Sequence, residues 1–250
     1  MTLAQGPWPT YTDAALDSVL RERREVEREC QAFQRFRQRI QTVDTQTPRF
    51  ERSVVGVDQN LTSEEKSVRN TIEPWYHDTV MAVDHYGDVY GDSFEASLSA
   101  EFGADVLLLI SEATTFSPLI KQRLLEAAQQ CIDNRRVFLE SLQDEFTTLK
   151  DVQSTVQEIR EAIAELDSTK LQGNSDIELT DRYETLHTLN DECKSWIQQR
   201  QEEIHAHRID RSADVDAYTD LCSYLYEGLE VDYPVLATFV DILEIISQYE

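Results

Sequence analysis

Apolar residues recur in alternating steps of three and four along the second half of the chain. The recurring positions are Leu124, Ala128, Cys131, Arg135, Phe138, Leu142, Glu145, Leu149, Val152, Val156, Ile159, Ile163 and Leu166. This spacing places their side chains along one seam of an α-helix, which only another helix can cover. Because Ser117 and Pro118 form a favourable helix start, the pattern predicts one helix over 118–170.

A second seam follows after a short interruption. Its members are Leu179, Leu186, Asn190, Cys193, Ile197, Arg200 and Ile204. Gly173 is expected to end the first helix, and Ser175 with Glu178 forms a capping box that opens a helix over 176–207. The short connection predicts that the two helices lie antiparallel as a coiled-coil hairpin.

The N-terminal part of the chain carries the same pattern. Its seam contains Leu16, Val19, Arg23, Val26, Cys30, Phe33, Arg37 and Ile40. We therefore expect residues 12–43 to form a helix that completes a coiled-coil bundle with residues 118–207. Residues 212–250 are expected to form a C-terminal helical pair, whose second helix begins at Pro234.

Residues 44–117 are expected to be an inserted helical segment with an irregular start. A capping box at its residues 62 and 65 begins a helix that we expect to end near His85–Gly87. Pro74 is expected to kink or divide this helix, because proline lacks the amide hydrogen that a helix interior needs. A further short helix is expected over 93–111.

Composition supports the all-α fold class. The 250 residues include only seven glycines and six prolines, whereas a fold with many strands needs more turn residues. The sequence therefore predicts an elongated helical bundle with a long antiparallel coiled-coil hairpin and smaller helical caps.

The charge balance limits the cellular environments and the binding partners that suit the protein. The chain has 48 acidic and 23 basic side chains, a net charge of −25, and only five of the basic residues are lysines. Such a surface suits the cytoplasm of a halophile, because molar salt screens its self-repulsion. The alternative is an acidic binding protein at ordinary salt, such as a mimic of nucleic acid. In either case direct binding to nucleic acid is not expected, because phosphate contacts need basic surface.

Cysteine spacing and hydropathy indicate a cytoplasmic protein that does not span a membrane. The cysteines Cys30, Cys131, Cys193 and Cys222 form no C-x-x-C pair, so we interpret them as reduced thiols, with Cys30 and Cys193 on helix seams. No apolar stretch is long enough to cross a bilayer. The N-terminus lacks the basic and apolar regions of a signal peptide.

Several motifs between residues 68 and 150, and one near the C-terminus, are similar to those of a known family. They are Thr79-Val80-Met81-Ala82-Val83, His85-Tyr86, Tyr90, Ala100-Glu101-Phe102-Gly103, Ser117-Pro118, Leu124-Leu125, Arg135-x-x-Phe138-Leu139 and Tyr233-Pro234-Val235-Leu236-Ala237-Thr238. With them the chain resembles an uncharacterised family of haloarchaeal proteins, classed as a domain of unknown function, from which Pro74-Trp75 and Asp84 depart. The resemblance implies an all-helical protein of a halophile and assigns no activity.

The segment His85–Asp92 is the one loop whose composition suggests a ligand. It contains Tyr-Gly-Asp twice, and Asp84, Asp88 and Asp92 recur every four residues beside His85. Oxygen ligands of this kind can hold a hard cation, although the spacing is not that of an EF-hand. The plainer interpretation is a helix end with a glycine cap and a solvated acidic loop.

Two charged residues interrupt the apolar seams at positions that should face each other. Antiparallel pairing around Gly173 places Glu145 opposite Arg200. The spacing Cys30, Phe33, Arg37 also matches Cys193, Trp196, Arg200. We therefore predict a structural polar layer of Arg37, Glu145 and Arg200, with Cys30 and Cys193 one heptad away. The alternative is that these side chains extend to solvent at the seam's edge.

The sequence contains no nucleophile elbow, phosphate loop or metalloprotease motif, so it predicts no catalytic residues and no cofactor. The first hypothesis is a non-catalytic scaffold, adaptor or regulatory protein that binds a protein partner, or a second copy, through its helices. The alternative is a small-molecule or metal-ion sensing module that uses the His85–Asp92 loop. An enzyme with a site in the bundle core is the third.

Overall fold

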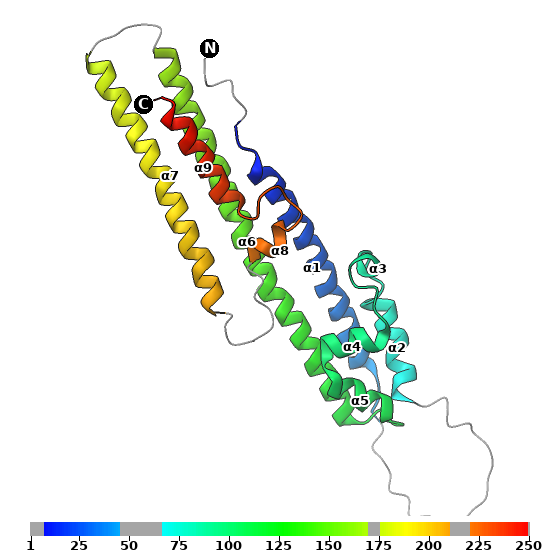
Figure 1. Cartoon of the computed structure of the whole chain (residues 1–250). Coiled ribbons are helices and arrows are strands. Elements are labelled where there is room, and N and C mark those ends of the chain that lie inside the picture. The colour runs from blue at the N-terminus through cyan, green and yellow to red at the C-terminus, as the bar shows by residue number, and fades with distance from the viewer. Residues whose placement is uncertain (1–7, 46–66, 170–175, 211–220, 250) are drawn as a thin grey trace, which may run out of the picture. The chain divides into compact units, whose positions relative to one another are not determined.

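A computed structural model describes residues 8–45, 67–169, 176–210 and 221–249. Every regular element of these residues is an α-helix (Figure 1). The elements are α1 (Tyr11–Thr42), α2 (Val68–Thr79), α3 (Tyr86–Val89), α4 (Phe94–Phe102), α5 (Ala104–Glu112), α6 (Pro118–Thr169), α7 (Asp176–Asp210), α8 (Leu221–Tyr226) and α9 (Pro234–Ser247). The all-α fold class predicted from the seams is confirmed.

The three long helices match the expected ranges to within three residues at each end. The expected start at residues 62 and 65, the turn at Gly173 and the capping serine at 175 lie outside the described residues. The chain forms two compact units, Met1–Glu22 with Leu142–Glu250, and Arg23–Ser141. The boundaries of these units fall inside α1 and α6. The expected division, which joined 12–43 with 118–207 and set apart 44–117 and 212–250, stays a prediction.

In the unit Met1–Glu22 with Leu142–Glu250, α9 packs beside α7 and runs antiparallel to it (Figure 1). The Trp196 and Phe239 rings stack with centroids 5.5 Å apart. At one end of the contact between α7 and α9, Arg182 donates a hydrogen bond to the carbonyl of Tyr249. The α6 seam is buried here, and Leu142, Leu149 and Val152 are fully inaccessible.

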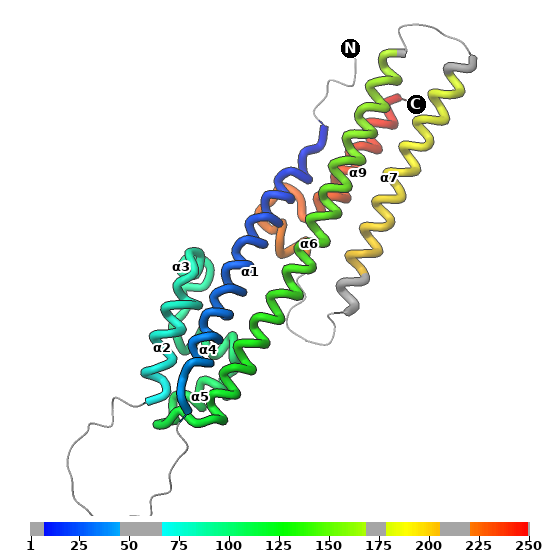
Figure 2. The backbone as a smooth tube through the Cα atoms, turned by 180° about the vertical axis from the view of Figure 1, so that it is seen from behind, coloured from blue at the N-terminus to red at the C-terminus, as the bar shows by residue number. Residues whose placement is uncertain are grey.

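In the unit Arg23–Ser141, α1 and α6 run antiparallel. Arg135 bonds Glu29, and Lys121 donates to the carbonyls of Gln41 and Val43, so residue numbers on the two helices run in opposite directions. The helices α2, α4 and α5 cover them (Figure 2). The core between these helices is aromatic, with Tyr76 surrounded by the rings of Phe36, Phe94 and Phe102.

Two expectations for the inserted segment were wrong in detail. The single helix expected over 93–111 is two helices, α4 and α5, because Gly103 between them has a φ of +89°, which side-chain-bearing residues rarely adopt. The helix that contains Pro74 ends at Thr79 rather than near His85, and Pro74 lies inside it. In the described ranges, no helix has both the length and the apolar content of a membrane span.

Candidate functional site

A short irregular segment between α2 and α4 supplies one wall of the site. The one-turn helix α3 is held by the amides of Val89 and Tyr90, which donate to the carbonyls of His85 and Tyr86. Gly91 then adopts a φ of +58°, in the left-handed region that glycine tolerates best. In the same segment the rings of Tyr86 and Tyr90 pack together with their centroids 5.3 Å apart.

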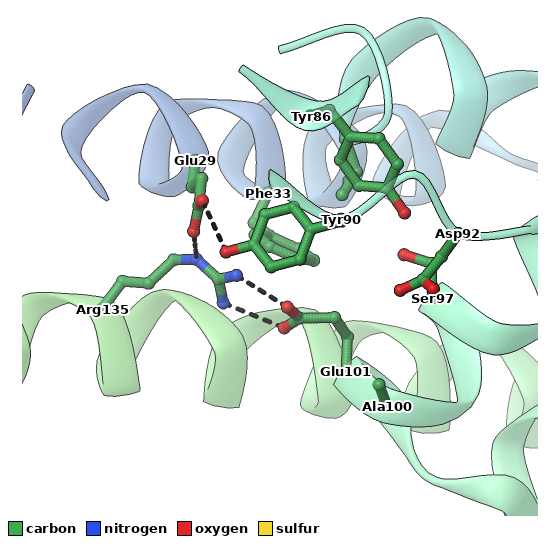
Figure 3. Close-up of a pocket in the computed structure, with 10 residues that line it drawn as sticks. Glu29, Phe33, Tyr86, Tyr90, Asp92, Ser97, Ala100, Glu101 and Arg135 are labelled. Atoms are coloured by element: carbon green, nitrogen blue, oxygen red, sulfur yellow. Dashed lines mark hydrogen bonds and ion pairs between the residues drawn. The ribbon is translucent and has the colours of Figure 1, made fainter. Parts of the chain in front are cut away.

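Arg135 on α6 is the centre of the site's polar network (Figure 3). Its Nη1 and Nη2 donate to the two carboxylate oxygens of Glu101 at 2.9 and 2.7 Å, and its Nε donates to Glu29 at 2.8 Å. The guanidinium carbon also lies 4.3 Å from the centroid of the Phe33 ring. A bidentate pair of this kind fixes orientation as well as supplying energy, so Arg135 holds α1, α4 and α6 in one arrangement.

The second oxygen of Glu29 binds the loop. Its Oε1 lies 2.9 Å from Nε2 of His85 and accepts a hydrogen bond from the Tyr90 hydroxyl at 3.0 Å. The side chains of Glu29 and His85 are 13% and 10% exposed, so solvent screens this contact little. Glu29 therefore connects the α3 segment to the Arg135 network.

Burial and charge shift the pKa values of several groups in this unit. Burial alone would lower the pKa of Arg135, but the carboxylates of Glu101 and Glu29 raise it above its ordinary value. Burial and the charge of Glu29 raise the pKa of Tyr90. Burial and the charge of Glu101 raise the pKa of Cys131 to about 12, which keeps the thiol protonated at neutral pH. The guanidinium thus stays charged while the phenol and the thiol stay neutral.

A cavity of about 70 Å³ adjoins this network. It is lined by Glu29, Phe33, Val80, Tyr86, Tyr90, Asp92, Ser97, Ala100, Glu101 and Arg135. The volume is several times the roughly 10–15 Å³ that one water needs, and about half of the ~150 Å³ of an engineered cavity that binds benzene. The cavity is therefore large enough for a small ligand or for the end of a longer one.

One polar atom at this cavity is left without a partner. The hydroxyl of Tyr86 is buried and makes no hydrogen bond of acceptable geometry with any described residue, although Ser97 lies close enough to affect its pKa. Figure 3 shows it directed toward Asp92 and Ser97. Burial chiefly raises the pKa of this phenol and the nearby Ser97 hydroxyl lowers it, with a net upward shift, so the phenol remains protonated. A buried hydroxyl without a partner costs roughly 1–3 kcal/mol, so the site favours a molecule that supplies one.

The four residues proposed as metal ligands do not gather around a point. Asp84 is exposed and lies 3.7 Å from Arg28, His85 contacts Glu29, Asp88 is exposed, and Asp92 lines the cavity. Within the residues that the structure describes, no group of three or more His, Cys, Asp or Glu side chains has the geometry of a metal site. The loop contributes aromatic rings and one carboxylate to the cavity instead.

The structure brings together two of the three residues of the expected polar layer. Nη2 of Arg200 donates to both oxygens of Glu145 at 2.7 and 2.6 Å, and these residues are 7% and 4% exposed. The Tyr226 hydroxyl and Cys222 Sγ complete the cluster. Arg37 belongs to the other unit, Arg23–Ser141, where it lines a hollow with Lys121 and Asp133, and its part in the layer stays a prediction.

The model of the family described as Domain of unknown function (DUF7260) matches residues 10–250. The chain belongs to the DUF7260 family. No curated protein and no solved structure matches it significantly. The match supports the uncharacterised family noted from the sequence and assigns no role to any residue of this DUF7260 protein.

Sequence reasoning did not single out the carboxylates that bind Arg135 in this DUF7260 chain. The sequence placed Arg135 in an apolar seam, and a charged residue at a seam position is the available signal of a buried partner. Glu101 stands in a motif quoted for the family resemblance, which gave it no role. The seam pattern marks neither Glu29 nor Glu101 as a partner of Arg135, because they lie 106 and 34 positions from it. The seam cysteines Cys30 and Cys193 are both buried and free, in separate units.

Proposed function

We propose that this protein is a non-catalytic binding protein for a small molecule, and that the cavity beside Arg135 is its binding site. The observation that carries the proposal is the buried Tyr86 hydroxyl, which borders the cavity and lacks a hydrogen-bond partner among the described residues. Buried polar groups in folded proteins are nearly always paired. A bound ligand that pairs with this hydroxyl accounts for it.

The rigidity of the surrounding network supports a binding role. Arg135 and Glu29 make five hydrogen bonds around the cavity. These bonds join α1, α4, α6 and the α3 segment. A site held in its bound arrangement loses less entropy when the ligand enters. The apolar side chains of Phe33, Val80 and Ala100, with a few convergent polar groups, are typical of small-molecule sites.

The scaffold hypothesis receives less support than the hypothesis of a sensing module that binds its ligand through the His85–Asp92 loop. Leu124, Leu149 and Ile159 of the α6 seam are buried within the protein's own units. The exposed large apolar residues of α6, Leu119 and Val137, stand singly. Isolated apolar residues are ordinary on protein surfaces and do not form a docking face.

The test is a thermal-shift screen of small molecules against the protein and two matched variants. Ala100→Leu adds bulk at an exposed position that lines the cavity, whereas Ala96→Leu makes the same change one turn earlier on α4, away from the lining. Ligands of the site should raise the melting temperature of the wild type and of Ala96→Leu but not of Ala100→Leu. The proposal is rejected if every stabilising molecule acts equally on both variants.

A further inference from the structure

If the cavity is the binding site proposed above, the charges that line it identify the class of its ligand. Three carboxylates, those of Glu29, Asp92 and Glu101, face it against one guanidinium. From this arrangement and the acceptors described below, we infer that the cavity binds the primary ammonium group of a small alkylamine. The protein's net charge of −25 also attracts cations to its surface.

An anionic ligand does not suit the cavity, because the positive charge that lines it is already paired. Arg135 is engaged by Glu101 and Glu29 and by the face of Phe33, so it is already neutralised. An anion would have to displace one of these carboxylates. Asp92, in contrast, makes no hydrogen bond or ion pair with another described residue. The unbalanced charge at the cavity is therefore negative.

The oxygen acceptors at the cavity match the donors of a primary ammonium. Such a group has three N–H donors and no acceptor. Asp92, Ser97 and Tyr86 each present oxygen toward the same part of the cavity (Figure 3). The Ser97 hydroxyl pairs with Tyr76 at 3.0 Å, and a hydroxyl oxygen has two lone pairs and so can accept from a second donor. One ammonium would thus satisfy Tyr86 and neutralise Asp92.

The size and the walls of the cavity limit the part of the ligand that enters. A volume of about 70 Å³ accommodates an ammonium with a short alkyl stem and little more. Val80 and Ala100 form an apolar wall for the stem, and the Tyr86 and Tyr90 rings can stabilise a cation over their faces. The same ammonium is carried by a free amine and by a lysine side chain.

Isothermal titration calorimetry at fixed ionic strength tests this inference with four probes. Propylammonium is compared with 1-propanol, which has the same shape and no charge, with propionate, and with tetramethylammonium, which has charge and no N–H donor. Because a charge-assisted hydrogen bond contributes about 1.5–3 kcal/mol, propylammonium should bind at least about tenfold more tightly than each of the others. Nα-acetyl-lysine methylamide separates the two sources, since tighter binding than propylammonium assigns a lysine and weaker binding assigns a free amine.

Two variants assign the effect to the site. Asp92→Asn removes the charge of an exposed residue, and Tyr86→Phe removes the unpaired hydroxyl and keeps the ring. Each should weaken propylammonium binding about tenfold or more and should weaken the binding of uncharged 1-propanol less. If propanol or propionate binds as tightly as propylammonium and is lost in Ala100→Leu, the ammonium inference is wrong and the cavity remains a binding site. If none of the probes binds, the ammonium inference is likewise overturned, and the Ala100→Leu screen decides separately on the proposed function.

Discussion

At the scale of single residues, buried ionic groups are held by more than one partner. Glu145 accepts from both Arg200 and Tyr226, and Arg135 donates to both Glu29 and Glu101. Such pairs contribute little net stability, because desolvation offsets the attraction between the charges. Removing one member is different, since the other charge is then left buried without compensation.

Glu145→Ala should therefore destabilise the protein strongly. The substitution leaves the guanidinium of Arg200 and the hydroxyl of Tyr226 buried without their shared acceptor. We expect the free energy of unfolding to fall by roughly 3–5 kcal/mol, measured by urea denaturation. Glu203→Ala is the matched control, because Glu203 also bonds Arg200 but is 34% exposed, and its loss should cost less than about 1 kcal/mol. Equal costs for the two substitutions would contradict the prediction.

The buried thiols should make the fold sensitive to alkaline pH. Burial, chiefly, raises the pKa of Cys131 and Cys193 to about 12, against roughly 8.5 in an unfolded chain. Above pH 8.5 the unfolded state loses thiol protons that the folded state keeps, so the free energy of unfolding must fall as pH rises from about 8.5 toward 12.

This alkaline loss can be assigned to the two thiols with urea unfolding between pH 8 and pH 9.5, below the range where unfolded tyrosines ionise. The wild type should lose stability steadily over this interval. The double variant Cys131→Ala, Cys193→Ala should be less stable at pH 8 but should show a flatter pH dependence. Parallel curves for the two proteins would contradict the assignment.

At the scale of elements, heptad periodicity located the long helices and not the contacts of the inserted segment. A seam of period 3.5 is a local property, so α1, α6 and α7 could be predicted from the chain alone. The register that places Glu145 opposite Arg200 also follows from the position of one turn, and the structure shows these side chains in contact. The break at Gly103 was missed, because the apolar pattern continues through it and only the positive φ divides the helix.

Only one wall of the cavity beside Arg135 could be predicted from the sequence. The repeated Tyr-Gly-Asp directed attention to the loop that supplies Tyr86, Tyr90 and Asp92. The expected use of the loop was a cation held by several carboxylates, which the geometry of the described residues does not provide. The other wall comes from α1, α4 and α6, and contacts between distant segments leave no periodic signal.

The register of α6 against α7 can be tested by a single cysteine. One heptad from the pair Glu145 and Arg200 lie Val152 and Cys193, both fully buried. If the register of Glu145 and Arg200 continues by one heptad, Val152→Cys should form a disulfide with Cys193 under mild oxidation, because the two residues would then face each other near the Cα separation of roughly 4.4–6.8 Å that a disulfide needs. Peptide mapping by mass spectrometry identifies the bond.

Ile159→Cys is the control for that crosslink. Ile159 is also buried in the α6 seam, but it lies a further heptad along, about 10 Å from the level of Cys193. It should give no disulfide with Cys193 under the same conditions. A crosslink from position 159 and none from 152 would show that the helices pair in a different register.

At the scale of the whole molecule, charge imbalance is the dominant feature. With 48 acidic and 23 basic side chains, much of the acidic surface has no basic partner to pair with. Residues 212–250 contain no lysine or arginine at all. Ion pairs such as Arg39 with Asp78 and Arg69 with Glu73 are partly exposed, so they offset little of the repulsion. The stability of the fold should therefore depend on the salt around it.

We expect helicity and melting temperature to fall as potassium chloride is lowered from about 2 M to about 0.1 M. The Debye length grows from a few ångströms at about 1 M to roughly 10 Å at 0.1 M, so each carboxylate then repels more of its neighbours. Circular dichroism across the titration measures both quantities. Sucrose at matched osmolality is the control, because it strengthens apolar burial without screening charge. If sucrose restored the melting temperature as fully as salt, hydration rather than screening would be the cause, and a melting temperature unchanged at 0.1 M would reject salt dependence altogether.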